Sequence, residues 1–291
     1  MAQLTLPNLT VQQLEYLVAA AEGPTRAVAA ASLGVTPSAL SQGLAELERR
    51  VGVQIFERQG RQTRLRPQAN EVLTHARRVV AETRDLARWA GMQRTGQAGM
   101  VRLGTIDAVA VHHRAEAIRE HRRATPGLDL RLTVAPSGAL LDSLLVGDLD
   151  LVVCVEPAGL VDGLVTSPCL EEPLYAYAPS DVHAGIPAQW GPWVTYPEGS
   201  HTRKVIAAGL SVLGAPFAVV AESNQPEVLR EMVRLGMGWA VLPAAGAEAG
   251  TEPLTRVRSR PVGVRRLVVA RRAEVVTDVA VDNLASVLLG G

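Results

Sequence analysis

The chain has 291 residues, more than one typical domain, and 47% of them are hydrophobic, which is enough for real cores. No stretch is apolar and long enough to span a bilayer, and the start, with Gln3, Pro7 and Asn8, lacks the basic residues of a secretory signal, so we expect a cytoplasmic protein with no membrane partner. The overall net charge of zero disfavours nucleic acid as a partner. The charge is unevenly distributed, however: residues 1–98 hold 12 Arg and 8 acidic residues, a net charge of 12 − 8 = +4, and the rest of the chain carries −4.

Residues 25–50 predict two short helices separated by a turn. Thr25–Leu33 and Thr36–Arg50 are the expected helices, and Gly34 and Val35 form the turn. Thr36 is a typical N-cap, and Pro37 suits the first helical position, where a missing N–H costs nothing. Apolar residues at helical spacing face inward (Leu40, Leu44, Leu47 and Val51), which leaves polar side chains outside, among them Ser38, Ser41 and Gln42. Such side chains near a helix start can reach base edges, although the same pattern also occurs in an ordinary helical hairpin.

The segment that follows predicts a β-hairpin rich in arginine. Two short β segments fit the residues after Gly52, and four arginines fall within nine residues: Arg58, Arg61, Arg64 and Arg66. Arginine clusters are often only solvated surface. Beside a recognition helix, however, guanidinium groups on one hairpin favour contact with a phosphate backbone, as in the wing of a winged helix.

Residues 67–98 predict one long helix. Its apolar and small residues recur at alternating spacings of four and three: Val72, Ala76, Val79, Thr83, Leu86 and Ala90. A seam of this kind favours pairing with a second copy of the helix, and the alternative is packing against its own domain. Gly91, Gly96 and Gly99 mark the end of the helix and a domain boundary.

From Val101 onward, short apolar runs alternate with helical segments, which predicts an α/β fold with mostly parallel strands. Ligands in such folds bind beyond the carboxyl ends of the strands. We therefore expect an effector site built from Ile106, Asp107, Ala108, Ser137, Gly138, Glu156, Thr195, Ser200, His201, Thr202 and Asn224. Ser137 and Asn224 are equally suited to capping helices, and Asp107 and Glu156 to the surface. The two carboxylates favour an amine or polyol ligand, whereas His201 near a helix start favours an anion, so the ligand's charge stays open.

Neither a metal site nor catalysis is expected. His112 and His113 point in different directions on a helix, and no cysteine or carboxylate set completes their coordination together with His121. Cys154 and Cys169 fit small buried hydrophobes better than a thiol switch. No nucleophile elbow, phosphate loop or dinucleotide fingerprint is present, so we expect no enzyme and no cofactor.

The N-terminal part resembles LysR-type transcriptional regulators through an ordered set of residues: Leu14, Ala29, Ala30, Leu33, Gly34, Val35, Thr36, Pro37, Ser38, Ala39, Leu40, Ser41, Leu47, Glu48, Gly52, Phe56 and Arg58. The segments 101–104, 147–153 and 233–243 resemble the effector domain of the same family. The chain departs from the family pattern around Arg26, at the entry to the motif, and around Arg66, after the wing. We still include both arginines among the expected DNA contacts.

The resemblance implies a winged helix-turn-helix (1–66), a dimerising linker helix (67–98) and a two-lobed effector domain like a periplasmic binding protein (99–291). Lobe I would comprise about 99–174 and 266–291, and lobe II about 175–265. The implied function is regulation of transcription through a two-fold symmetric DNA site, modulated by a small molecule bound between the lobes. A dimer or tetramer is implied, with RNA polymerase as a further partner of an activator. An architectural DNA binder and a solute-binding protein whose winged helix contacts other proteins are the alternatives.

Overall fold

The structure is a computed structural model that describes residues 7–59, 62–95, 99–250, 252–273 and 278–290. The chain divides into two compact units, Met1–Gln97 with Leu145–Asp148, and Ala98–Leu144 with Leu149–Gly291. We call them the N-terminal unit and the C-terminal unit. No helix among the described residues is long and apolar enough to cross a membrane.

The N-terminal unit contains three helices and a hairpin, followed by a long helix. The helices are α1 (Val11–Glu22), α2 (Arg26–Ser32) and α3 (Pro37–Val51), and the hairpin pairs β1 (Phe56–Gln59) with β2 (Gln62–Leu65) in antiparallel register. A 3₁₀ turn (Pro67–Ala69) leads into α4 (Asn70–Thr95). The apolar face of α3 is buried as predicted and packs with α1 and with Ile55 in one core. The helix-turn-helix and the wing are therefore both present.

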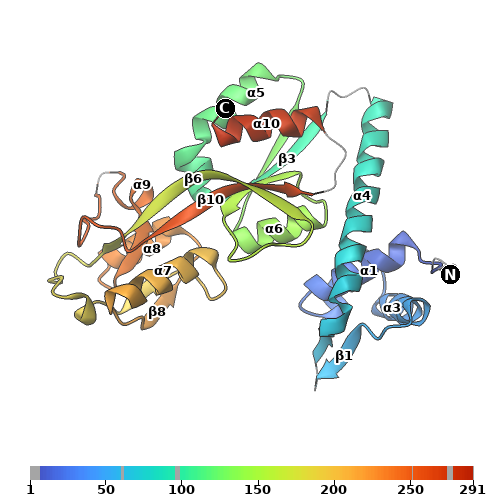
Figure 1. Cartoon of the computed structure of the whole chain (residues 1–291), viewed down its shortest axis with the longest axis horizontal. Helices are drawn as coiled ribbons and strands as arrows, with labels where there is room; N and C mark the ends of the chain where they lie inside the picture. Colours follow the sequence, from blue (N-terminus) through green and yellow to red (C-terminus); the bar gives the residue numbers. More distant parts are fainter. Residues whose placement is uncertain (1–6, 60–61, 96–98, 251, 274–277, 291) are drawn as a thin grey trace, which may run out of the picture. The chain divides into compact units, whose positions relative to one another are not determined.

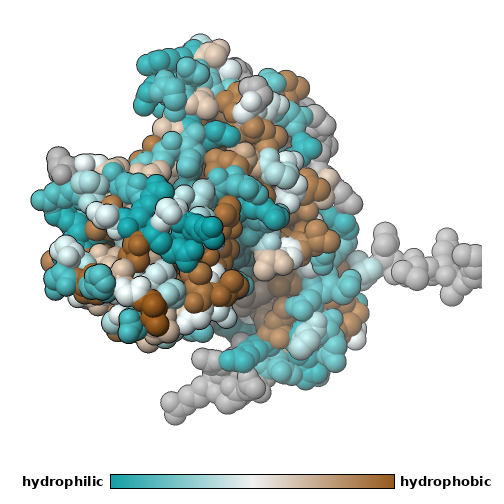
Figure 2. Space-filling view, turned by 60° about the vertical axis from the view of Figure 1, so that its left-hand side comes forward, coloured by the Kyte–Doolittle hydropathy of each residue, from teal (hydrophilic) through white to brown (hydrophobic). Residues whose placement is uncertain are grey.

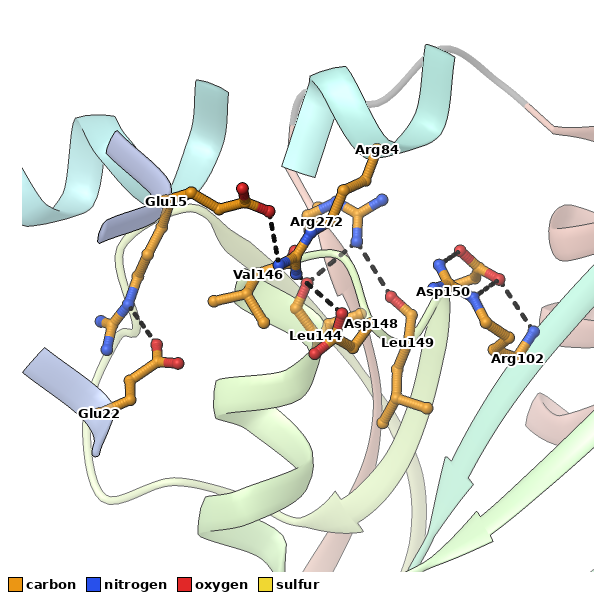
Figure 3. Close-up of polar contacts among 11 residues, drawn as sticks. Glu15, Glu22, Arg84, Arg102, Leu144, Val146, Asp148, Leu149, Asp150 and Arg272 are labelled. Carbon is orange, nitrogen blue, oxygen red and sulfur yellow. Dashed lines mark hydrogen bonds and ion pairs between the residues drawn. The ribbon is translucent and has the colours of Figure 1, made fainter. Parts of the chain in front are cut away.

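The first half of α4 packs against its own unit. Leu73, Ala76, Val80 and Ala81 are buried, and α1 lies against this face. Ion pairs from the arginines of α4 to α1 flank the contact; Arg84 Nη2, for example, lies 3.4 Å from Glu15 Oε1 (Figure 3). Part of the predicted seam is thus occupied within the chain. Further along α4, Leu86 is 64% exposed.

A six-stranded sheet runs through the C-terminal unit in the order β4-β3-β5-β10-β6-β9. The strands are β3 (Met100–Thr105), β4 (Asp129–Val134), β5 (Leu151–Val155), β6 (Leu164–Tyr177), β9 (Ala240–Pro243) and β10 (Gly263–Arg272). Strands β4, β3 and β5 are parallel, whereas the pairs β5–β10, β10–β6 and β6–β9 are antiparallel. The expectation of mostly parallel strands is therefore wrong, because β6 and β10 run the full length of the unit in opposite directions.

The first core of this unit, core I, surrounds β3, β5 and the end of β10. Helices α5 (Ala115–Ala124) and α10 (Val279–Leu289) cover one face of the sheet, and α6 (Ser137–Leu145) covers the other (Figure 1). A π-helical turn (Val109–His113) links β3 to α5. On the edge of core I, Arg102 Nη2 lies 2.6 Å from Asp150 Oδ1 and the backbone N–H of Arg102 donates to Asp150 Oδ2 (Figure 3). This pair fixes the chain before β5.

The second core, core II, lies at the other end of β6 and β10 (Figure 1). It contains the parallel pair β7 (Trp193–Thr195) and β8 (Val219–Glu222), with α7 (His201–Leu213), α8 (Pro226–Arg234), α9 (Ala244–Ala247) and a 3₁₀ turn (Pro187–Gln189). Trp190 stacks on Trp239 with ring centroids 5.5 Å apart, and Trp193 meets Trp239 at 6.0 Å. On the face shown in Figure 2, hydrophobic and hydrophilic residues are intermingled.

Candidate DNA-binding surface and effector site

The start of α3 presents the predicted base-reading side chains to solvent. Thr36 is the N-cap, and its Oγ1 accepts from the N–H of Ala39 at 3.1 Å, with Pro37 next to it. Ser38 and Gln42 are exposed, and Ser41 is half-buried. Because the leucines of α3 hold its opposite face in the core, this polar face is fixed in orientation and free to meet a groove.

The end of α3 carries a local ion network instead. Glu46 accepts from Arg49 Nε at 2.7 Å and lies 2.5 Å from Arg50 Nε. The hydrogen bond from Arg49, with that from Arg50, lowers the pKa of Glu46 to about 2. This one carboxylate binds both arginines and offsets one of their two charges. The exposed hydroxyl and amide side chains suited to base edges lie in the first turns of the helix.

The four predicted wing arginines and Arg26 lie in different environments. Arg64 is exposed on β2 and forms no ion pair with a described residue, whereas Arg66 lies 3.5 Å from Glu57. Arg26 lies over the ring of Phe56, 5.2 Å from its centroid. The backbone of Arg58 belongs to β1, but its side chain, like the whole of Arg61, lies outside the described residues. Of the two hairpin arginines whose side chains the structure describes, Arg64 is therefore the one without an ion pair.

A buried polar chain lies where β6 and β10 pass between cores I and II. Arg265 on β10 donates from Nε to Glu172 on β6 at 2.7 Å and from Nη1 to Thr202 Oγ1 at 2.9 Å. The other oxygen of Glu172 lies 2.6 Å from His113 Nε2. The side chains of Arg265 and Glu172 are only 3% and 5% exposed. Burial disfavours the charged carboxylate, yet the bond from His113 and the charge of Arg265 hold the pKa of Glu172 below its usual value.

Two further groups near this chain lack full partners. The hydroxyl of Tyr196, which directly follows β7, is buried and makes no hydrogen bond within the described structure, and burial raises its pKa to about 12. Asp107, after β3, accepts the N–H of Ala108 at 2.8 Å and makes no other hydrogen bond with a described residue. Burial raises the pKa of Asp107 above its usual range, although the hydrogen bond from Ala108 lowers it. Unpaired buried polar groups are costly, which makes this the place in the unit best suited to a polar ligand.

The predicted effector residues fall into three groups. Asp107 and Thr202 join the Arg265 chain, together with buried neighbours Ile106, Ala108 and Thr195. Ser137 Oγ accepts from the N–H of Val155 and His201 Nδ1 lies 3.3 Å from its carbonyl oxygen, while Ser200 caps α7. Glu156, Gly138 and Asn224 are exposed. Glu156 lies 3.5 Å from Arg266. The side chains of Arg266 and Arg265 point to opposite faces of β10, because the two residues are consecutive in the strand. Asn224 caps no helix, because the N-cap of α8 is Gln225.

Sequence reasoning missed Glu172, Arg265 and the role of His113. The sequence does carry one sign of this contact: two adjacent glutamates (Glu171 and Glu172) lie in one strand, and two adjacent arginines (Arg265 and Arg266) lie in another. In the β10–β6 register, Arg265 is opposite Glu172 and Arg266 is opposite Glu171. Matching acidic and basic doublets in two such strands suggest antiparallel neighbours.

Metal and thiol chemistry have no visible support in the described part of the chain. It contains no cluster of three or more His, Cys, Asp or Glu residues able to hold a metal ion. Burial raises the pKa of the Cys154 thiol to about 12. Cys169 donates to the carbonyl oxygen of Leu288 at 3.1 Å. The buried environment of Cys154 disfavours a thiolate.

A winged helix with a polar recognition face, joined to a two-core α/β unit with buried polar groups between the cores, defines a DNA-binding regulator that responds to a small molecule. Residues 11–70 match the family model described as bacterial regulatory helix-turn-helix protein, lysR family, and residues 94–290 match the LysR substrate binding domain. The chain belongs to the LysR family of transcriptional regulators.

Relatives match either half of the chain or nearly all of it. An uncharacterized HTH-type transcriptional regulator, YfeR of Shigella flexneri, is 26% identical over 300 residues, covering 97% of each chain. A probable hydrogen peroxide-inducible genes activator of Mycobacterium avium is 38% identical over 56% of this chain and 52% of its own. A full-length OxyR variant from Pseudomonas aeruginosa, with one cysteine replaced by aspartate, superposes with a TM-score of 0.59 at 25% identity, covering 97% and 98% of the two chains. CbnR in complex with its target DNA, at 18% identity over 97% and 99% of the chains, shares the fold with a TM-score of 0.56.

Proposed function

We propose that this regulator reads a two-fold symmetric promoter site with the first turns of α3 and holds the DNA backbone with its wing. Two observations carry the proposal. The polar start of α3 is exposed, and Arg64 of the hairpin is exposed and forms no ion pair with a described residue. Hydroxyl and amide groups on that face suit base edges, and a free guanidinium suits phosphate. The protein acts in the cytoplasm, has no enzymatic activity, and contacts RNA polymerase where it activates.

The division of labour is tested by DNA-binding titrations at several salt concentrations. Gln42→Ala should relax base preference while leaving the salt dependence unchanged. Arg64→Ala should weaken binding to all sequences alike and reduce the salt slope by about one. Arg123→Ala, which removes the same charge from an exposed site of the C-terminal unit, is the matched control and should change neither property. Equal effects of Gln42→Ala on cognate and unrelated DNA would refute the assignment.

We also propose that the chain pairs with a second copy through α4. Leu86 is 64% exposed, and Ala81 is the last buried residue of α4 among those the structure describes. A large exposed apolar residue on a seam of heptad spacing suits a helix partner. Leu86→Glu should shift sedimentation equilibrium toward monomer and abolish cooperative binding to two half-sites. Val212→Glu, at a position 87% exposed on α7, is the control and should leave the oligomer intact.

The effector is proposed to bind at the Arg265 chain, where Tyr196 and Asp107 have unused hydrogen-bonding capacity. A ligand that satisfies these groups in one arrangement of cores I and II would shift the population toward that arrangement and change DNA affinity. Oxidation of Cys154 is not proposed, because this thiol is buried with a raised pKa.

The effector assignment is tested with metabolites of the genes next to the bound promoter. One of them should change DNA affinity saturably, and Tyr196→Phe should reduce its potency without changing DNA affinity in its absence. A saturable ligand whose potency is unaffected by Tyr196→Phe would contradict the location. A complete lack of small-molecule response would favour an architectural DNA binder.

A further inference from the structure

Glu48 connects the end of the recognition helix α3 to the start of the wing. Its backbone carbonyl oxygen accepts the N–H of Gly52 at 2.8 Å, which ends the helix. One oxygen of its side chain, Oε1, accepts the N–H of Ile55 at 2.7 Å and that of Phe56 at 3.1 Å. A single residue of α3 therefore binds the chain on both sides of the turn that leads to β1.

Ile55 is the residue at which both ends of the wing hairpin are anchored. Its side chain is fully buried in the core of the N-terminal unit. Its carbonyl oxygen accepts the N–H of Arg66, which follows β2, at 2.9 Å. Because β1 directly follows Ile55, the bond to Glu48 holds the entry to the hairpin and the bond from Arg66 holds its exit.

The hairpin depends on these bonds for its direction. Among the described strands, β1 and β2 pair only with each other, and a two-stranded hairpin by itself is marginally stable in water. Phe56 and Leu65, which are opposite in the register, pack partly against the core, but apolar contact has no preferred direction. Hydrogen bonds to a carboxylate are directional and stronger than neutral ones. The two bonds to Glu48 therefore set the angle at which the hairpin leaves α3.

We infer that Glu48 is a positioning residue for DNA binding, which holds the wing so that Arg64 meets the phosphate backbone while α3 lies in the groove. The inference rests on the proposed DNA contacts of α3 and Arg64. The carboxylate itself is unsuited to DNA, because its charge repels phosphate. Glu48→Ala should therefore strengthen phosphate binding if only charge matters and weaken it if position matters. The two effects have opposite signs.

Two further substitutions separate the reach of the side chain from its charge. Glu48→Gln removes the charge but keeps an oxygen at the same distance from the backbone, so it should preserve both bonds. Glu48→Asp keeps the charge, but its side chain is one methylene shorter, so it should lose them.

Hydrogen exchange tests the bonds without DNA. In Glu48→Ala and Glu48→Asp, the N–H groups of Ile55 and Phe56 should exchange with deuterium about tenfold faster or more, and in Glu48→Gln they should stay protected. The exchange is measured by mass spectrometry on peptides of the full chain that span residues 53–59. Peptides from α1 should be unchanged in all three variants.

Binding to a short duplex of unrelated sequence at several salt concentrations measures the phosphate contacts. Glu48→Ala and Glu48→Asp should reduce the salt slope by about one, as Arg64→Ala does, and Glu48→Gln should not. Partial unfolding would lower the affinity by a similar factor at every salt concentration and leave the slope unchanged. Glu46→Ala, the matched control, removes the same charge from the same helix but releases Arg49 and Arg50, so the slope should stay or rise.

Combining Glu48→Ala with Arg64→Ala completes the test. The second substitution should have little further effect on the slope, because the guanidinium of a misplaced wing no longer meets phosphate. Losses that simply add would overturn the inference, and so would equal slopes in Glu48→Gln and Glu48→Asp or unchanged exchange at Ile55 and Phe56. No effect of Arg64→Ala in the wild-type chain would instead refute the proposed wing contact, whereas faster exchange in Glu48→Ala would still show that Glu48 holds the hairpin.

Discussion

Replacing Arg265 tests whether the buried polar chain holds the two cores together. Arg265→Met keeps much of the side chain's volume but leaves the carboxylate of Glu172, 5% exposed, with only His113 as its side-chain partner. Removing one member of a buried ion pair typically costs about 3–5 kcal/mol. With urea m-values of about 1–3 kcal/mol/M, toward the upper end for a unit of this size, the unfolding midpoint should fall by about 1–2 M.

The assay is urea unfolding followed by tryptophan fluorescence, because Trp190, Trp193 and Trp239 lie together in core II. The double variant Arg265→Met with Glu172→Met should recover much of the loss, since apolar replacement of a whole buried pair is often neutral. Single variants that each cost less than about 1 kcal/mol, or costs that simply add in the double variant, would refute the reasoning.

The same chain sets a pH dependence with a definite sign. The folded-state pKa of Glu172 is below its usual value of 4.5, despite burial, because of His113 and Arg265. A lowered folded pKa contributes stability that is present above the unfolded value and is lost as the pH falls through the folded pKa. Wild type should therefore lose this contribution below pH 4.5, and Arg265→Met should show a weaker acid dependence there.

Three further predictions concern local features. Thr36→Ala removes the N-cap bond of α3 and should cost about 1 kcal/mol in thermal unfolding, whereas Thr36→Ser should cost much less; equal losses would contradict the cap. Gly209→Ala would place a Cβ against the carbonyl of Val262 and should destabilise by about 1–3 kcal/mol in urea, while Gly138→Ala, with open space, should not; a neutral Gly209→Ala would show that α7 can move away from β10. Cys154 should resist a disulfide-exchange reagent until the chain unfolds, and rapid labelling in native conditions would mean that the thiol is accessible.

The DNA-binding half is predictable from sequence because its signals are local. Thr36 and Pro37 start α3, Gly52 with φ 74° ends it, and the leucine spacing selects its buried face. Each of these signals acts within one or two helical turns, so tertiary structure has little to override. Helix α4 shows the limit of such reasoning, because the spacing of its apolar residues does not say which of two partners they meet. The structure assigns Ala76 to its own unit and leaves Leu86 exposed.

The effector unit is less predictable because its polar chain joins residues far apart in sequence. Glu172 and Arg265 are 93 positions apart and meet only through the β10–β6 register, which includes an irregularity between Leu267 and Val268. The strand-end rule points to Asp107 and Thr202, which lie at this polar chain. The rule could not show that Ser137 bonds the backbone of Val155, or that β6 and β10 continue through both cores.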